Sequence, residues 1–193
     1  AAETGASDGL EGLADALHAN GKEDEALEVA RKNAEEEPSA VAHLLQLMSR
    51  QRRPLEQRVR EVERVASKHR GSREYFAGCV ERGLMLAGGG AELVEQLQAG
   101  CLGFLPAERR QYQRLLGAFC ERDFVRAARA VEAAPGADWD VDRCLLAAAA
   151  LKLARQEPPA WLTASLRRII KDEWIYDECA QYCLGEAPLS ALS

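Results

Sequence analysis

Apolar residues recur every three or four positions through most of the chain, which is the spacing that places them on one face of an α-helix. Three of the segments that show this spacing are listed here by their apolar residues: Leu10, Leu13, Ala14 and Leu17; Phe76, Cys79, Val80, Gly83 and Leu84; Tyr112, Leu115, Leu116, Phe119 and Cys120. No segment alternates apolar and polar residues in the manner of a half-buried strand. The pattern predicts an all-α protein.

The signals for helix starts are evenly spaced. A capping side chain or a proline suited to the first turn of a helix occurs at Ser39, Ser72, Pro106, Asp138 and Asp172, at intervals of 33, 34, 32 and 34 residues. Ser7 or Asp8 supplies an earlier start. Helical units of this length do not bury their apolar faces alone and stack on one another. The spacing favours an α-solenoid over the alternative, a helical bundle without repeats.

A second helix fits within each unit. These helices are expected over residues 23–36, 54–69, 91–102 and 123–134, and after Pro158-Pro159. Gly71 is expected in the left-handed conformation after the second of them, and Asp123 is expected to cap the fourth. A final helix over 172–184, ended by Gly185, completes five helix pairs and a closing helix. The predicted repeat domain spans residues 7–185, between an N-terminal tail (1–6) and a C-terminal tail (186–193).

The first unit resembles the tetratricopeptide repeat (TPR) family. The family pattern is matched in size and spacing by residues 10–17, then by Ala26-x3-Ala30 and Pro38, although leucine or alanine replaces its aromatic residues. The segment 21–26 is similar to the family's turn and second-helix start. This close match covers residues 7–40, and the later units keep only the period.

The resemblance implies a right-handed superhelix that binds peptides or helices of other proteins on a concave surface formed by the first helix of each pair. Some members of the family hold the acidic C-termini of chaperones with a lysine and an asparagine on this surface. Glu11 and Asp15 occupy the equivalent positions here and would repel a carboxylate. A chaperone clamp is therefore not expected.

Charge is distributed unevenly along the chain. The net charge of −6 divides into −8 over residues 1–37, +6 over 38–130 and −4 over 131–193. A basic middle favours an acidic partner, whereas the alternative is an ordinary solvated helix face. A nucleic-acid partner is not expected for a net acidic chain, because phosphate contacts supply most of such affinity. The candidate basic contacts are Arg50, Arg52, Arg53, Arg109, Arg110 and Arg114.

Aromatic residues concentrate near the C-terminus. Trp161, Trp174 and Tyr176 offer a second candidate contact surface. Docking on a partner and packing in the core explain them equally well.

No motif indicates catalysis or a cofactor. Cys179 and Cys183 form the one close cysteine pair, one helical turn apart, but the histidines or second pair that complete a zinc site are missing. Gly88-Gly89-Gly90 lacks the lysine and serine or threonine of a phosphate-binding loop. Neither a metal, another cofactor nor a small-molecule substrate is expected, and Cys179 and Cys183 remain the weak metal candidates.

These observations favour a non-enzymatic scaffold or adaptor, such as an accessory subunit of a larger assembly. Two alternatives stay open: a receptor or co-chaperone-type module for a short acidic peptide in a basic groove, and a helical metalloprotein or enzyme. No apolar run reaches the length of about 18 residues that spans a membrane. Reduced cysteines favour an intracellular reducing compartment, such as the cytoplasm, the nucleus or an organelle interior.

Overall fold

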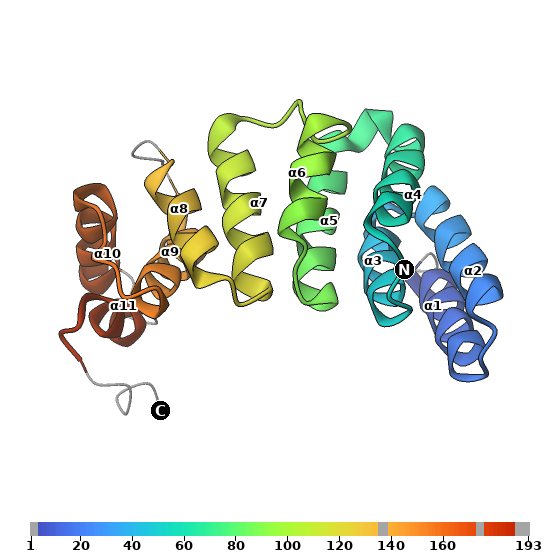
Figure 1. Cartoon of the computed structure of the whole chain (residues 1–193), viewed down its shortest axis with the longest axis horizontal. Coiled ribbons are helices and arrows are strands. Elements are labelled where there is room, and N and C mark those ends of the chain that lie inside the picture. The colour runs from blue at the N-terminus through green and yellow to red at the C-terminus, as the bar shows by residue number, and fades with distance from the viewer. Residues whose placement is uncertain (1–3, 135–138, 173–175, 188–193) are drawn as a thin grey trace. The chain divides into compact units, whose positions relative to one another are not determined.

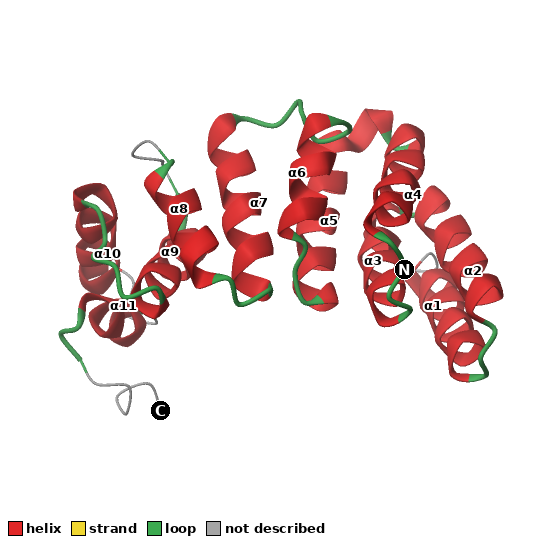
Figure 2. Ribbon diagram, viewed as in Figure 1, coloured by secondary structure: helices red, strands yellow, loops and turns green. Residues whose placement is uncertain are grey.

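The computed structural model describes residues 4–134, 139–172 and 176–187, and within these ranges the regular structure is entirely helical. Eleven α-helices and two short 3-10 helices are found there, and no strand is present in the described part (Figures 1 and 2). The expectation of an all-α protein is confirmed. The chain divides into two compact units, Ala1–Leu105 and Pro106–Ser193, which are described separately.

Unit 1 contains six α-helices that lie side by side (Figure 1). α1 packs on α2, α3 packs on α5, and α2, α4 and α6 form a row in which each contacts the next. Helices at alternate positions in the sequence are therefore neighbours in space. The helices are α1 (Thr4–Ala19), α2 (Glu23–Glu36), α3 (Val41–Arg50), α4 (Leu55–Lys68), α5 (Arg73–Ala87) and α6 (Ala91–Ala99), with 3-10 helices at Pro38–Ala40 and Arg70–Ser72.

The core of unit 1 is a continuous cluster of aliphatic side chains, centred on α3. Leu44, Leu45, Leu47 and Met48 of this helix are all essentially inaccessible to solvent. α3 and α5 pack against each other at Gly83, where a β-carbon would stand 2.6 Å from the Leu45 side chain. A residue without a side chain is thus what allows these two helices to pack together.

Unit 2 contains five helices: α7 (Ala107–Cys120), α8 (Phe124–Glu132), α9 (Val141–Leu153), α10 (Ala160–Asp172) and α11 (Asp177–Leu184). α7 packs on α8, α8 on α9, and α9 contacts both α10 and α11. The buried residues on α9 are mostly alanines, whereas α10 contributes Leu162, Leu166 and Ile169. Small side chains on one helix and large ones on its neighbour allow close packing.

The same turn follows five of the helices, α1, α3, α5, α7 and α9. A residue that follows each helix has a positive φ, and the N–H of the residue after it donates to the carbonyl five residues earlier. This is the Schellman arrangement, which satisfies the last carbonyls of a helix. These left-handed residues lie 31–36 positions apart in the sequence. They are Gly21, Arg52, Gly88, Arg122 and Arg155, and Gly185 ends α11 in the same way.

Several predicted helix ends are confirmed. α2 covers the expected residues 23–36, and Gly185 follows α11 with φ 78°. Asp123 caps α8, because its side chain accepts a hydrogen bond from the Arg126 N–H at 3.0 Å. Pro106 directly precedes α7. Local signals in the sequence therefore predict these ends well.

Other predicted ends are wrong. Gly71 does not adopt the left-handed conformation but lies within the 3-10 helix Arg70–Ser72, because the chain continues in a helical turn directly into α5. Asp172 ends α10 instead of beginning the last helix, and α11 starts at Asp177, where Asp177 and Glu178 suit its positive end.

The remaining differences are shifts of a few residues. α1 begins at Thr4, before Ser7 and Asp8, and α6 stops at Ala99. Asp138 lies outside the described residues; the cap of α9 is Asp140, which accepts a hydrogen bond from the Arg143 N–H at 3.0 Å.

Candidate partner-binding surface

The first basic group lies at the end of α3 and pairs with acidic residues of the first hairpin. Arg50 Nη1 lies 3.0 Å from Asp15 Oδ1 on α1, and Arg53 Nη2 lies 2.6 Å from Asp24 Oδ1 on α2. Arg52 is exposed and is the left-handed residue of the turn. Two of the three predicted contacts therefore pair with acidic residues of the N-terminal segment within unit 1.

Asp15 also contacts a buried histidine. His43 Nε2 lies 3.3 Å from the same Asp15 oxygen that Arg50 contacts, and His43 is only 7 % exposed. Its Nδ1 is buried without a hydrogen-bond partner in the described part of the chain. Asp15, which the TPR resemblance placed on the binding surface, thus joins α1 to α3.

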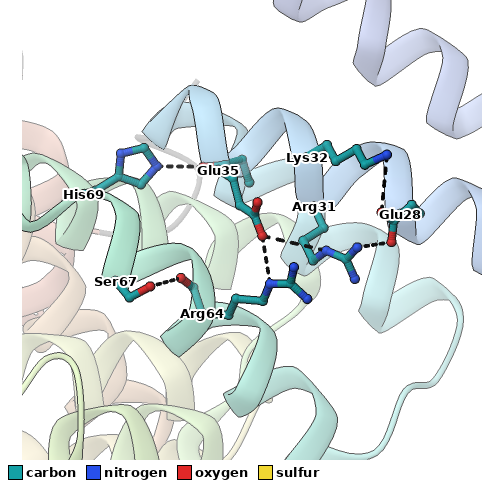
Figure 3. A network of polar contacts seen from close by, with 8 residues as sticks. Glu28, Arg31, Lys32, Glu35, Arg64, Ser67 and His69 are labelled. Atoms are coloured by element: carbon teal, nitrogen blue, oxygen red, sulfur yellow. Dashed lines mark hydrogen bonds and ion pairs between the residues drawn. The ribbon is translucent and has the colours of Figure 1, made fainter.

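A second polar network joins α2 to α4 (Figure 3). Glu35 Oε1 lies 2.8 Å from Arg64 Nε, and Glu28 contacts both Arg31 and Lys32. Such pairs near the surface each contribute about 0–1 kcal/mol. Within this network, the contact between Glu35 and Arg64 links α2 to α4. Arg64 lies far from Glu35 along the chain, and the sequence did not predict this contact.

The second basic group lies on α7. Arg109 and Arg110 are half-buried and Arg114 is exposed, and each of the three already interacts with another group of the protein. The Arg143 guanidinium lies over the ring of the neighbouring Tyr112, 4.8 Å from its centre. The three arginines share one helix, as predicted.

The predicted aromatic contacts lie in different parts of unit 2. Trp161 of α10 is half-buried and packs edge-on against Trp139, with the ring centres 5.5 Å apart. Trp139, which is 2 % exposed, was not singled out in the sequence. Tyr176 is half-buried just before α11, and Trp174 lies outside the described residues. Trp161 thus contributes to the packing of unit 2.

The cysteines are free thiols. Cys179 and Cys183 are half-buried on α11, and no group of three or more metal-ligating side chains occurs among the described residues. Burial raises the pKa of Cys183, and burial together with the Glu63 carboxylate raises the pKa of Cys101 to about 11. A raised pKa keeps the thiols of Cys183 and Cys101 protonated and poorly nucleophilic near neutral pH.

An exposed apolar strip on α5 was not predicted. Tyr75, Met85 and Leu86 are 58 %, 52 % and 47 % exposed, and Arg82 is exposed between them. These four residues, here named the α5 strip, cover about 16 Å of helix at 1.5 Å per residue. The apolar spacing in the sequence predicted only the buried face of α5. The signal for the strip was the presence of large apolar residues at helical spacing outside that face.

None of the described helices combines the length and apolar character needed to cross a membrane. No model of a known protein family, no curated protein and no solved structure matches the chain.

Proposed function

We propose that the protein is an α-solenoid of TPR-like helical hairpins that binds other proteins, as an adaptor or as an accessory subunit of an assembly. The recurrence of one Schellman turn every 31–36 residues supports this proposal. The packing of α3 on α5 and of α2, α4 and α6 in a row also supports it, because stacked repeats contact mainly their neighbours.

The α5 strip carries the proposal of a binding surface. Tyrosine and methionine are enriched where proteins meet, and a cluster of large exposed apolar side chains is a mark of an interaction site. Tyr75, Met85 and Leu86 lie on one rigid helix, whose buried side is fixed by Phe76, Val80 and Leu84. A partner that covered the strip would bury these side chains at little cost in conformational entropy of the backbone.

The test has two stages. The full chain first serves as bait in native extract, and a stoichiometric partner identified by mass spectrometry is then purified. Its affinity is measured for the chain and for a Met85→Ser/Leu86→Ser variant. We expect affinity to fall at least about tenfold, because each large side chain contributes about 1.5–3 kcal/mol when fully buried.

A Leu13→Ser/Leu153→Ser variant is the matched control, since Leu13 and Leu153 are as exposed as Met85 and Leu86 but lie on other helices. Unchanged affinity in this control and a loss in the α5 variant support the proposed surface. If the α5 variant and the control variant bound the partner equally well, the α5 strip would not be the contact surface. The absence of any stoichiometric partner would contradict the adaptor function itself.

The acidic-peptide receptor is the second candidate, and the three arginines that share α7 favour it. An Arg110→Glu/Arg114→Glu variant tests it in the same assay. Loss of the partner in this variant, together with a steep fall of affinity as the salt concentration rises, would support capture by arginines over apolar docking.

A further inference from the structure

Unit 1 contains an open pocket of about 290 Å³. It is formed by the end of α4, the 3-10 helix Arg70–Ser72, the start of α5 and the turn after α6. Drug-sized ligands occupy pockets of roughly 300–1,000 Å³, so this one suits a smaller group. Ser67, His69, Arg70, Arg73, Phe76 and Phe104 line it.

Two arginines, Arg70 and Arg73, line this pocket. The Arg73 guanidinium lies 5.8 Å from the centre of the Phe104 ring, a cation–π arrangement that restrains the side chain and leaves its N–H groups available. Arg70 has no ion pair or hydrogen bond of its side chain within the described residues. Arginine N–H groups that are not engaged elsewhere are suited to the oxygens of a phosphate.

His69 is a mostly buried residue that lines the pocket and has one ring nitrogen without a partner among the described residues. The residue is 9 % exposed, its ring stacks on Phe76 with centres 5.8 Å apart, and its Nε2 lies 2.7 Å from the Ala34 carbonyl oxygen (Figure 3). Because a carbonyl only accepts, Nε2 carries a hydrogen and donates it. In the tautomer that carries its hydrogen on Nε2 the lone pair is on Nδ1, and no described residue bonds to that atom.

The start of α5 lies beside the pocket, which Arg73 and Phe76 of this helix line. Ser72 precedes this helix but its side chain makes no capping hydrogen bond. The first N–H groups of a helix have no partner within the helix, and a phosphate is a common acceptor for them. Glu63 also lines the pocket and brings one negative charge, against two positive charges from Arg70 and Arg73.

We propose that this pocket binds a phosphate group. The oxygens of a hydrogen phosphate accept from Arg70, from Arg73 and from the first turn of α5, while its P–OH donates to Nδ1 of His69. A carboxylate lacks this donor and would face the His69 lone pair. The site goes beyond the proposed function, because it requires no protein partner.

The test follows the ¹H–¹⁵N spectrum of the full chain and the ring resonances of His69 as a phosphate ligand is added. Inorganic phosphate and N-acetyl-O-phosphoserine are the two probes, which distinguish a free phosphate from a phosphorylated side chain, and acetate is the carboxylate control. Arg70→Gln and Arg73→Gln each remove one pocket arginine. Arg60→Gln removes an exposed arginine of α4 outside the pocket.

We expect at least one phosphate probe to shift the His69 ring and the N–H signals of residues 73–75, with acetate giving little change. Each pocket variant should weaken binding about tenfold, as loss of a hydrogen bond to a charged group does, and Arg60→Gln should leave it unchanged. No shift with either probe overturns the proposal, and so does an equal response to acetate. Equal weakening in all three variants would show general charge attraction and would also overturn it.

Discussion

Gly83 of α5 and Leu45 of α3 touch where no side chain has room. A β-carbon at Gly83 would stand 2.6 Å from Leu45 Cδ1 and 3.0 Å from the Ala42 Cα. The second of these atoms belongs to the backbone, so rotation of a side chain does not relieve the clash. The contact therefore sets the distance between two central helices of unit 1.

Gly83→Ala is expected to destabilise the protein by about 1–3 kcal/mol, because it overpacks a filled core. Gly12→Ala is the control, since Gly12 also lies inside a helix but has no atom within 4 Å of its would-be β-carbon. This change should stabilise by about 0.5–1 kcal/mol. Urea unfolding of both variants measures the two values, and effects of the same sign would contradict the packing described here.

Arg122 occupies the left-handed position after α7 with φ 63°. A residue with a β-carbon pays about 1–2 kcal/mol for this conformation, and glycine does not. Arg122→Gly is therefore expected to stabilise unit 2 by about 1 kcal/mol. Arg129→Gly, at an exposed position inside α8, should destabilise by a similar amount. Thermal unfolding of the two variants compares the same substitution in two backbone conformations.

Asp15 contacts Arg50 and the buried ring of His43 through one oxygen. Arg50→Ala removes an exposed ion pair and should cost less than about 1 kcal/mol. Asp15→Ala also leaves His43 Nε2 without a partner and should cost about 1–3 kcal/mol. Equal losses in the free energy of unfolding would mean that the hydrogen bond to His43 contributes nothing.

The pKa of Cys101 is raised from 9.0 to about 11, first by burial and then by the Glu63 carboxylate. The folded state therefore holds this proton more tightly than the unfolded state. Its contribution to stability is complete below pH 9.0 and is lost as the pH rises through 11. The stability difference between the protein and a Cys101→Ala variant should shrink across this window. A difference independent of pH would contradict the raised pKa.

Much of the fold follows from local patterns. The helical spacing predicts α2 over its full length, and Asp123 and Gly185 mark helix ends by their own backbone chemistry. The left-handed arginines show the limit of such reasoning. Arg52, Arg122 and Arg155 adopt a conformation that the sequence signals only through glycine or asparagine, so three of the recurrent turns carry no visible mark.

The candidate surface was harder to predict, because it depends on which residues meet in three dimensions. Arg50 and Arg53 are basic and hydrophilic, but their partners Asp15 and Asp24 lie 35 and 29 residues earlier in the chain. The α5 strip shows the opposite case, in which apolar residues are exposed. Met85 and Leu86 have the composition of core residues, and only the position of α3 against the other face of α5 leaves them exposed.

The pairing of Asp15 with Arg50 and of Asp24 with Arg53 gives the first hairpin a further consequence. The hairpin acts as a built-in counter-ion for the end of α3. Charge that would otherwise attract nucleic acids or other polyanions is already compensated within the molecule. We therefore expect α1 and α2 to lower the affinity of the chain for polyanions such as heparin.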